Sequence, residues 1–285
     1  MSDSLKLVRQ LREMTGAGIL DCKKYLERTN NNLDDAIKLF RTESGKKAEK
    51  KSSRVAADGI LVSTLTNDYA TILEINTETD FAAKDSSFLS FAEKVKTYIT
   101  ENKVTDISSL EDSSLEEERK TLIQTIGENI QLRRIETISF TSEMKKGLYM
   151  HFDSKLAAIV ITKDGSDEVA RNIAMHVSAF NPLCLSEDDI DKDVLEREKA
   201  IFANQAKESG KPQEIMDKMV EGKVKRFLSE VSLLSQDFVK DPEITVLEYL
   251  NQNGAIALDF VRLKVGEGIE VETKDFAEEV AEQLK

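Results

Sequence analysis

Residues 69–100 read YATILEINTETDFAAKDSSFLSFAEKVKTYIT, and this stretch contains a strand, a corner and a helix in succession. The first seven residues, 69–75, are rich in aromatic and β-branched side chains without a breaker, which predicts a buried β-strand. Between the strand and the helix, residues 76–85 form a polar corner whose only aromatic side chain is Phe81. Residues 86–100 predict an amphipathic helix, because large apolar side chains recur at helical spacing, at Phe88, Phe91, Val95 and Tyr98.

Phe81 has two alternative roles at this corner. It either tucks under the following helix as a hydrophobic staple, or it stands exposed as a contact for another protein. Spacing alone favours the staple. The rest of the chain has to decide between the two roles.

The composition predicts a soluble, helix-rich globular protein with room for two or three domains. Of the 285 residues, 40% are hydrophobic and 33% are charged, and only three are proline. No apolar run is long enough to cross a bilayer, and charges interrupt the N-terminus where a signal peptide would be apolar, so we expect a cytoplasmic protein. Cys22 and Cys184 are far apart and have no Cys or His at ligand spacing, which favours reduced thiols.

The charge is unevenly distributed along the chain. Residues 1–54 contain 13 Lys and Arg against 8 Asp and Glu, a net charge of +5. Because the whole chain carries −13, residues 55–285 carry −18. An acidic body argues against a nucleic-acid backbone as the main partner. The basic front end fits RNA or an acidic protein surface, although a solvated helical face is the simpler interpretation.

Residues 1–54 predict a compact module of three helices. The segment 15–18 (TGAG) separates the first two helices, and its glycines do not make a phosphate loop, because a third glycine and a preceding strand are lacking. Asn32 is the expected N-cap of the third helix, Gly45 its C-cap, and the charged segment 46–54 a linker, either extended or transiently helical. The apolar stripes of the three helices are Leu7, Val8, Leu11 and Met14; Ile19, Cys22 and Leu26; and Leu33, Ala36, Ile37 and Phe40.

The body of the chain contains one pattern twice, a hairpin of two strands followed by a helix. It appears over residues 59–100 and again over residues 147–180, and each copy has the apolar face needed to cover a small antiparallel sheet. After the first copy, a helix over residues 113–125 ends at Gly127 and a strand follows over residues 130–140. The corner at residues 126–129 is therefore a candidate neighbour of the Phe81 corner.

The C-terminal part of the chain adds an arm and a closing strand. Residues 187–230 predict a helical hairpin that turns at Gly210 and Pro212, and its charged helices are typical of a protruding arm, either structural or for docking a partner. Residues 260–265 alternate as a strand, and a glycine-rich turn follows. Residues 274–284 predict a short amphipathic helix.

The chain holds no recognisable catalytic or metal-binding set. His151 lies on a predicted strand and His176 within a predicted helix, and their spacing favours structural roles for both. No Cys–His pair, nucleophile elbow or phosphate loop is present. A lone carboxylate in a turn, such as Asp80, is usually a cap of the following structure. We therefore expect a binding protein, not an enzyme, with no cofactor and no metal.

Five short stretches stand out along the chain: LREMTGAGILDCKK at 11–24, AADG at 56–59, TDFAAKD at 79–85, IGENI at 126–130 and VGEGIE at 265–270. They resemble the translation elongation factor Ts family, in the same order and at compatible spacing over essentially the whole chain. The resemblance implies an α+β fold with an N-terminal three-helix ubiquitin-associated-like module, a two-lobed duplicated α+β core with antiparallel sheets, and a protruding helical hairpin. The expected domains are residues 1–54, 55–140, 141–269 with the inserted hairpin, and a C-terminal helical module at 270–285.

The same resemblance implies a guanine-nucleotide exchange factor for the GTPase elongation factor Tu. Such a factor binds the GTPase with GDP and promotes GDP release by disturbing its Mg²⁺ and phosphate site, without binding nucleotide, nucleic acid or membrane itself. Phe81 is then the exposed wedge, and Asp80 holds the corner. At the position of Ala82 the family usually has Val. The other implied contacts are Thr79 and Ala82; Arg12, Ile19 and Leu20; and Ile126, Gly127 and His151.

A function from another class is also compatible with the sequence. The basic N-terminal module would then act as an adaptor that binds a ubiquitin-like protein or RNA, and the rest of the chain would be its scaffold.

Overall fold

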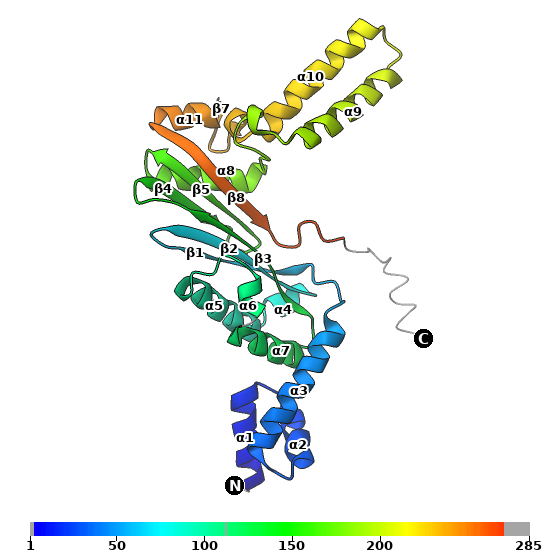
Figure 1. The fold of residues 1–285 in the computed structure, drawn as a ribbon, viewed down its shortest axis with the longest axis vertical. Coiled ribbons are helices and arrows are strands. Elements are labelled where there is room, and N and C mark those ends of the chain that lie inside the picture. Colours follow the sequence, from blue (N-terminus) through cyan, green and yellow to red (C-terminus); the bar gives the residue numbers. More distant parts are fainter. Residues whose placement is uncertain (1–2, 112, 271–285) are drawn as a thin grey trace. The chain divides into compact units, whose positions relative to one another are not determined.

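The structure is a computed structural model that describes residues 3–111 and 113–270 (Figure 1). Its described residues form an α+β fold of helices and small antiparallel sheets, as the sequence predicts. They fall into two compact units: unit 1 takes the residues up to Thr64, Leu73–Ile135 and those from Lys264, and unit 2 takes Leu65–Ile72 and Glu136–Leu263. The predicted helix at 274–284 and the module at 270–285 lie outside the described residues, except for Glu270.

Unit 1 begins with the three predicted helices, α1 (Asp3–Thr15), α2 (Ile19–Arg28) and α3 (Leu33–Lys51). Asn32 caps α3 as expected, since its side chain accepts a hydrogen bond from the Asp35 N–H. The apolar stripes are only partly correct, because Met14 and Ile19 are 64% and 57% exposed. The core of this helical module is formed by Val8, Leu11, Cys22, Tyr25, Leu26, Ala36 and Phe40.

The predicted end of α3 at Gly45 is wrong, and so is the assignment of residues 46–54 as a linker over most of its length. The helix continues through Lys51. Ala48 is buried in the core of the neighbouring lobe, and Ser44 donates to Gln124 of that lobe. Tertiary packing therefore outweighs the weak helix propensity of Gly45.

The first predicted hairpin-plus-helix consists of β1 (Asp58–Leu65), β2 (Tyr69–Thr77) and α5 (Ser86–Glu101), and all of it except Leu65–Ile72 belongs to the lobe of unit 1. The strand β2 is buried along its whole length, between β1 and β3 (Ile130–Ser139) in a three-stranded sheet. Helices α4 (Asp80–Ala83), α6 (Ser108–Glu111) and α7 (Ser114–Ile126) complete the lobe. The apolar face of α5 packs into the core as predicted, through Phe88, Phe91, Val95 and Ile99, with Tyr98 half-buried against it.

A buried carboxylate, Glu74, ties the turn after the last strand onto the sheet of unit 1. It accepts hydrogen bonds from Arg133 Nη1 at 3.0 Å, Arg134 Nε at 2.6 Å and the Gly266 N–H at 2.8 Å. Burial by itself raises the pKa of Glu74, but the bonds from Gly266, Asn76 and Arg134 outweigh burial and hold that pKa below its ordinary value. The predicted glycine-rich turn at 266–268 is present, and its first N–H binds this carboxylate.

Unit 2 contains the second predicted copy, β4 (Met144–Met150), β5 (Leu156–Asp164) and α8 (Asp167–Phe180). The two strands are antiparallel with Gly147 opposite Val160, and β8 (Ala255–Lys264) pairs on the other side of β5. The helix α8 packs on this sheet with α11 (Val246–Gln252) and a small hairpin of β6 (Asp237–Phe238) and β7 (Asp241–Thr245).

The predicted helical hairpin is confirmed, with α9 (Lys192–Glu208) and α10 (Gln213–Val231) packed side by side (Figure 1). Gly210 adopts φ +64° at the turn and Pro212 precedes α10. The pair extends away from the sheet of its unit, and α10 has no buried residue. No helix in the described part of the chain is both long and apolar enough to span a membrane.

His176 is a structural histidine, as its helical setting predicts. It is fully buried in α8, where the Val239 N–H donates to Nδ1 at 3.1 Å and Nε2 lies 2.9 Å from Gln236 Oε1. Because Nδ1 accepts, Nε2 carries the single proton of a neutral ring. Phe180 stacks on that ring with centroids 4.7 Å apart.

The neutral state of His176 predicts a loss of stability in mildly acidic solution. Burial lowers the pKa of His176 in the folded chain. The unfolded chain therefore binds a proton below pH ~6.5 that the folded chain does not bind, so stability is complete above that pH and falls below it. We expect the free energy of unfolding to decline by up to about 1.4 kcal/mol per pH unit there, measured by urea unfolding. A His176→Gln variant with the same pH dependence as the wild type would contradict this.

Candidate partner-binding site

Phe81 is exposed, so the staple role is wrong. It lies on α4, a single helical turn directly after β2, and 82% of its surface is accessible. The next two residues, Ala82 and Ala83, are 5% and 3% exposed and seat the turn on the core. Small residues therefore face inward at this corner, and the one large apolar residue faces solvent.

The corner is a capped helix and not an open turn. Thr79 is the N-cap of α4, and its hydroxyl accepts a hydrogen bond from the Ala82 N–H at 3.2 Å. Asp85 caps α5 in the same way, by accepting from the Ser87 N–H at 2.8 Å. The expectation that Asp80 caps the following structure is wrong, because the N-cap of α4 is Thr79 and that of α5 is Asp85. Asp80 instead pairs with Lys84 at 2.7 Å.

The corner at 126–129 lies directly against the Phe81 corner, so the prediction that the two corners are neighbours is confirmed. Gly127 ends α7 in the left-handed conformation, with φ +90°, and this turns the chain sharply into β3. The next residue, Glu128, accepts hydrogen bonds from Thr77 Oγ1 at 3.0 Å, the Thr79 N–H at 2.9 Å and Thr79 Oγ1 at 2.7 Å. Ile126 is half-buried against the core of the lobe.

A further hydrogen bond joins the two corners, and here the donor lies in the 126–129 corner and the acceptor in the Phe81 corner. Glu78, next to Thr79, accepts a hydrogen bond from the Asn129 N–H at 2.6 Å. The side-chain amide of Asn129 donates to the Arg54 carbonyl at 2.9 Å. Hydrogen bonds to carboxylates are among the stronger ones in proteins, so these contacts fix the backbone that carries Phe81. Neither Glu78 nor Glu128 was predicted as a site residue from the sequence, although each lies within or beside one of the quoted stretches.

The predicted contacts of the helical module are all exposed, on the two helices that flank the turn between α1 and α2. Ile19 and Leu20 begin α2 and are 57% and 74% exposed. Arg12 is exposed on α1, and its carbonyl accepts a hydrogen bond from the Gly16 N–H at 2.7 Å. Met14, at 64% exposed, adds a further apolar side chain that the sequence analysis assigned to the core.

His151 belongs to unit 2, and its predicted place on a strand is wrong. It follows the end of β4 in the tight loop to β5, where its N–H donates to the Leu156 carbonyl at 2.8 Å. The last residue pair of these two strands is Met150 opposite Ala157, so His151 lies just beyond the paired part of β4. The imidazole Nδ1 lies 3.0 Å from the Tyr149 hydroxyl, and the ring packs against Phe152, which is 91% exposed. Phe152 is a second exposed aromatic that the sequence analysis did not single out.

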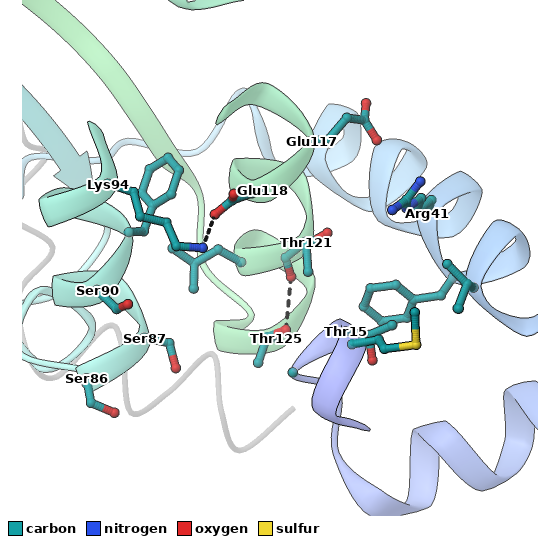
Figure 2. A pocket seen from close by; sticks show the side chains of 16 residues that line it. Thr15, Arg41, Ser86, Ser87, Ser90, Lys94, Glu117, Glu118, Thr121 and Thr125 are labelled. Carbon is teal, nitrogen blue, oxygen red and sulfur yellow. Dashed lines mark hydrogen bonds and ion pairs between the residues drawn. The ribbon is translucent and has the colours of Figure 1, made fainter. Parts of the chain in front are cut away.

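A groove of about 610 Å³ lies between the helical module on one side and α5 and α7 on the other, within unit 1 (Figure 2). Figure 2 shows serines of α5 and threonines of α7 on one side, with Thr15 and Arg41 of the module on the other. Lys94 is paired with Glu118 at 2.6 Å, and Glu117 adds a further negative charge. The negative charge of these carboxylates would repel the polyphosphate of a nucleotide, so the groove is unsuited to binding one. The described residues contain no cluster of His, Cys, Asp and Glu able to hold a metal ion.

Comparison with known proteins supplies the family. The sequence model described as Elongation factor TS matches residues 78–267, which is more than half of the chain and includes Phe81 and the corner at 126–129. The chain belongs to the elongation factor Ts family. Elongation factor Ts of Hahella chejuensis is 45% identical to it over 284 residues, covering 99% of this chain and 98% of that protein.

Other elongation factor Ts proteins are similar over their full length. That of Thioalkalivibrio sulfidiphilus is 42% identical over 292 residues, covering 100% of this chain and 99% of the relative. That of Francisella tularensis subsp. novicida is 45% identical over 288 residues, covering 99% and 98%. Membership in the elongation factor Ts family makes this chain a translation elongation factor that works as an exchange factor and has no catalysis of its own.

Proposed function

We propose that this elongation factor Ts chain binds the GTPase elongation factor Tu in its GDP-bound state and promotes the release of GDP. The observation that supports this most strongly is the exposure of Phe81, at 82%, on a corner whose backbone is held by hydrogen bonds from a second corner. An exposed aromatic residue on a fixed backbone has the properties of an interface hot spot. As a translation factor, the protein acts in the cytoplasm.

The mechanism is a thermodynamic coupling between two ligands of the GTPase. The GTPase holds GDP through its phosphate loop and a Mg²⁺ ion, and release is slow because these contacts break together. Phe81 inserts between elements of the GTPase that support the Mg²⁺ site, so factor and nucleotide each weaken the binding of the other by the same factor. Every tenfold increase in the release rate requires about 1.4 kcal/mol of lowered barrier.

The other predicted contacts supply affinity and orientation. Arg12 supplies an exposed basic side chain, and Ile19 and Leu20 supply exposed apolar ones, which fit a partner surface with an acidic rim. His151, with its ring held by Tyr149, offers a further contact from unit 2. None of these residues has to touch the nucleotide, because the coupling acts through the conformation of the GTPase.

Calorimetric titration of the GTPase with this protein tests the proposed coupling. We expect tighter binding to the nucleotide-free GTPase than to the GDP-bound form, by the same factor by which the protein weakens GDP binding. Titration of the protein alone with GDP or GTP should give no heat of stoichiometric binding. Equal affinity for both forms of the GTPase would reject the proposal, and exclusive binding of RNA or a ubiquitin-like protein would favour an adaptor.

Deleting residues 1–54 should weaken binding to the GTPase while residues 55–285 remain folded. The deletion removes the surface of Arg12, Ile19 and Leu20, but it also removes Ala48 and Lys51, which contact the lobe. We therefore expect a cooperative urea transition at a lower midpoint. A shorter deletion of residues 1–42 is the matched control, because it keeps the lobe contacts of Ser44, Ala48 and Lys51 while it removes the hydrogen bond between Tyr25 and Gln124. Loss of the cooperative transition in both proteins would contradict the boundary.

A further inference from the structure

We infer that Glu128 is a positioning residue for nucleotide exchange, which acts by holding Phe81 in the orientation that the GTPase meets. The inference rests on the proposed function and extends it to a residue that does not itself need to touch the GTPase. It follows from three features of the interlocked corners: the short length of α4, the hydrogen bonds that Glu128 accepts, and the independent support of Glu128.

The helix that carries Phe81 is too short to hold its own shape. It contains only the four residues of α4, whereas isolated helices need roughly 12–15 residues to be even marginally stable in water. The phenyl ring is 82% exposed and therefore contributes little packing of its own. The orientation of Phe81 must come from the residues on either side of it.

Glu128 supplies that orientation on the N-terminal side. Its carboxylate accepts from the Thr79 N–H at 2.9 Å and from Thr79 Oγ1 at 2.7 Å, and Thr77 Oγ1 donates to the same group at 3.0 Å. The Thr79 hydroxyl also accepts from the Ala82 N–H, which makes it the cap of α4. One hydroxyl therefore connects the Glu128 carboxylate to the first turn of the helix that presents Phe81.

Glu128 is itself held in place by contacts outside the Phe81 corner. Gly127 before it adopts φ +90°, and the carbonyl of Gly127 accepts a hydrogen bond from Lys51 Nζ of α3. Asn129 after it is buried, and its side chain donates to the Arg54 carbonyl at 2.9 Å. The carboxylate is thus oriented before the corner binds it, as a positioning residue requires.

The free protein offers a direct test of positioning, because the sequence contains no tryptophan. The substitution Phe81→Trp places a single indole at the corner, and its nanosecond motion is measured by time-resolved fluorescence anisotropy. Adding Glu128→Ala should increase the amplitude of that motion clearly, and adding Glu128→Gln should increase it less, since the amide retains one acceptor oxygen and can donate to Thr79. An unchanged amplitude in Glu128→Ala would overturn the inference without bearing on the proposed function.

Exchange kinetics give the second test. In the otherwise wild-type protein, Glu128→Ala should lower the maximal rate of GDP release at saturating factor roughly tenfold, since displacing a positioned group by about 1 Å can cost up to 100-fold. The half-saturating concentration should change by less than about threefold, because the other contacts remain. Glu128→Gln should retain most of the wild-type rate, and a rate as low as that of Glu128→Ala would count against positioning.

A double-variant cycle separates positioning from a direct or a general structural role. If Glu128 acts through Phe81, Glu128→Ala combined with Phe81→Ala should release GDP no more slowly than Phe81→Ala alone. If the rate losses of the two single variants multiply in the double variant, the inference is overturned. A wild-type rate of GDP release in Glu128→Ala would overturn it as well. If Glu128→Ala fails to give a cooperative urea transition, Glu128→Asp takes its place in the cycle, because it keeps the charge but withdraws the carboxylate from Thr79 by one methylene. Failure of the wild-type protein to speed release would instead reject the proposed function, and the inference with it.

Discussion

Phe81→Ala should lower the maximal rate of GDP release from elongation factor Tu by roughly 30-fold, which corresponds to the ~2 kcal/mol that defines a hot-spot residue. The reason is that the exposed ring has no equivalent at this corner, where Ala82 and Ala83 face the core. The free energy of unfolding should shift by less than about 1 kcal/mol, because surface substitutions rarely do more. Stopped-flow release of labelled GDP at saturating factor, paired with urea unfolding of the free variant, measures both quantities.

The control for Phe81→Ala is Leu247→Ala, which removes another exposed apolar side chain, 45% accessible, from α11 of unit 2. It should leave release at the wild-type rate. Asp80→Ala should act in the same direction as Phe81→Ala but less strongly, since Asp80 supports the corner through its pair with Lys84 and does not fill the partner's pocket. If Phe81→Ala instead loses about 3–5 kcal/mol in its free energy of unfolding and releases GDP at the normal rate, Phe81 acts as a core residue and not as a contact.

Glu74→Ala should reduce the free energy of unfolding by about 3–5 kcal/mol, the usual result of breaking a buried ion pair. The substitution leaves Arg133, Arg134 and the Gly266 N–H without the fully buried carboxylate that they share. Urea unfolding measures the loss. Glu118→Ala is the matched control, because its pair with Lys94 is 44% and 55% exposed and such pairs contribute about 0–1 kcal/mol.

The pH dependence of the Glu74 contribution follows from the direction of its pKa shift. The folded-state pKa of Glu74 is lowered, so the contribution is present above the unfolded value of about 4.3 and is lost as pH falls through the folded value. At neutral pH the wild type and Glu74→Ala should therefore differ by the full amount. Equal stability of the two proteins at neutral pH would show that the cluster is dispensable.

The elements that depend on local periodicity could be predicted from the sequence. The strand β2 and the helix α5 follow from their apolar spacing, and the second copy in β4, β5 and α8 follows from the same pattern. Asn32 and Gly127 were identifiable as a cap and a helix end because each has a local conformational reason.

The errors arise where distant contacts outweigh local signals. Gly45 is a plausible helix end, but Ala48 packs into a lobe that lies far along the sequence. The spacing around Phe81 suits a staple, but the small side chains of Ala82 and Ala83 occupy the inward positions. The bonds of Glu128 to Thr79 require two corners separated by 49 residues to meet, and no local pattern contains that information.

The most direct test of the account is the rate at which labelled GDP leaves elongation factor Tu, followed by stopped-flow fluorescence in excess unlabelled GDP. With increasing amounts of the wild-type protein, we expect the rate to rise and then saturate, and with Phe81→Ala we expect saturation at a much lower rate. A release rate that stays at its spontaneous value, in a mixture where calorimetry shows that the two proteins bind, would contradict the central claim.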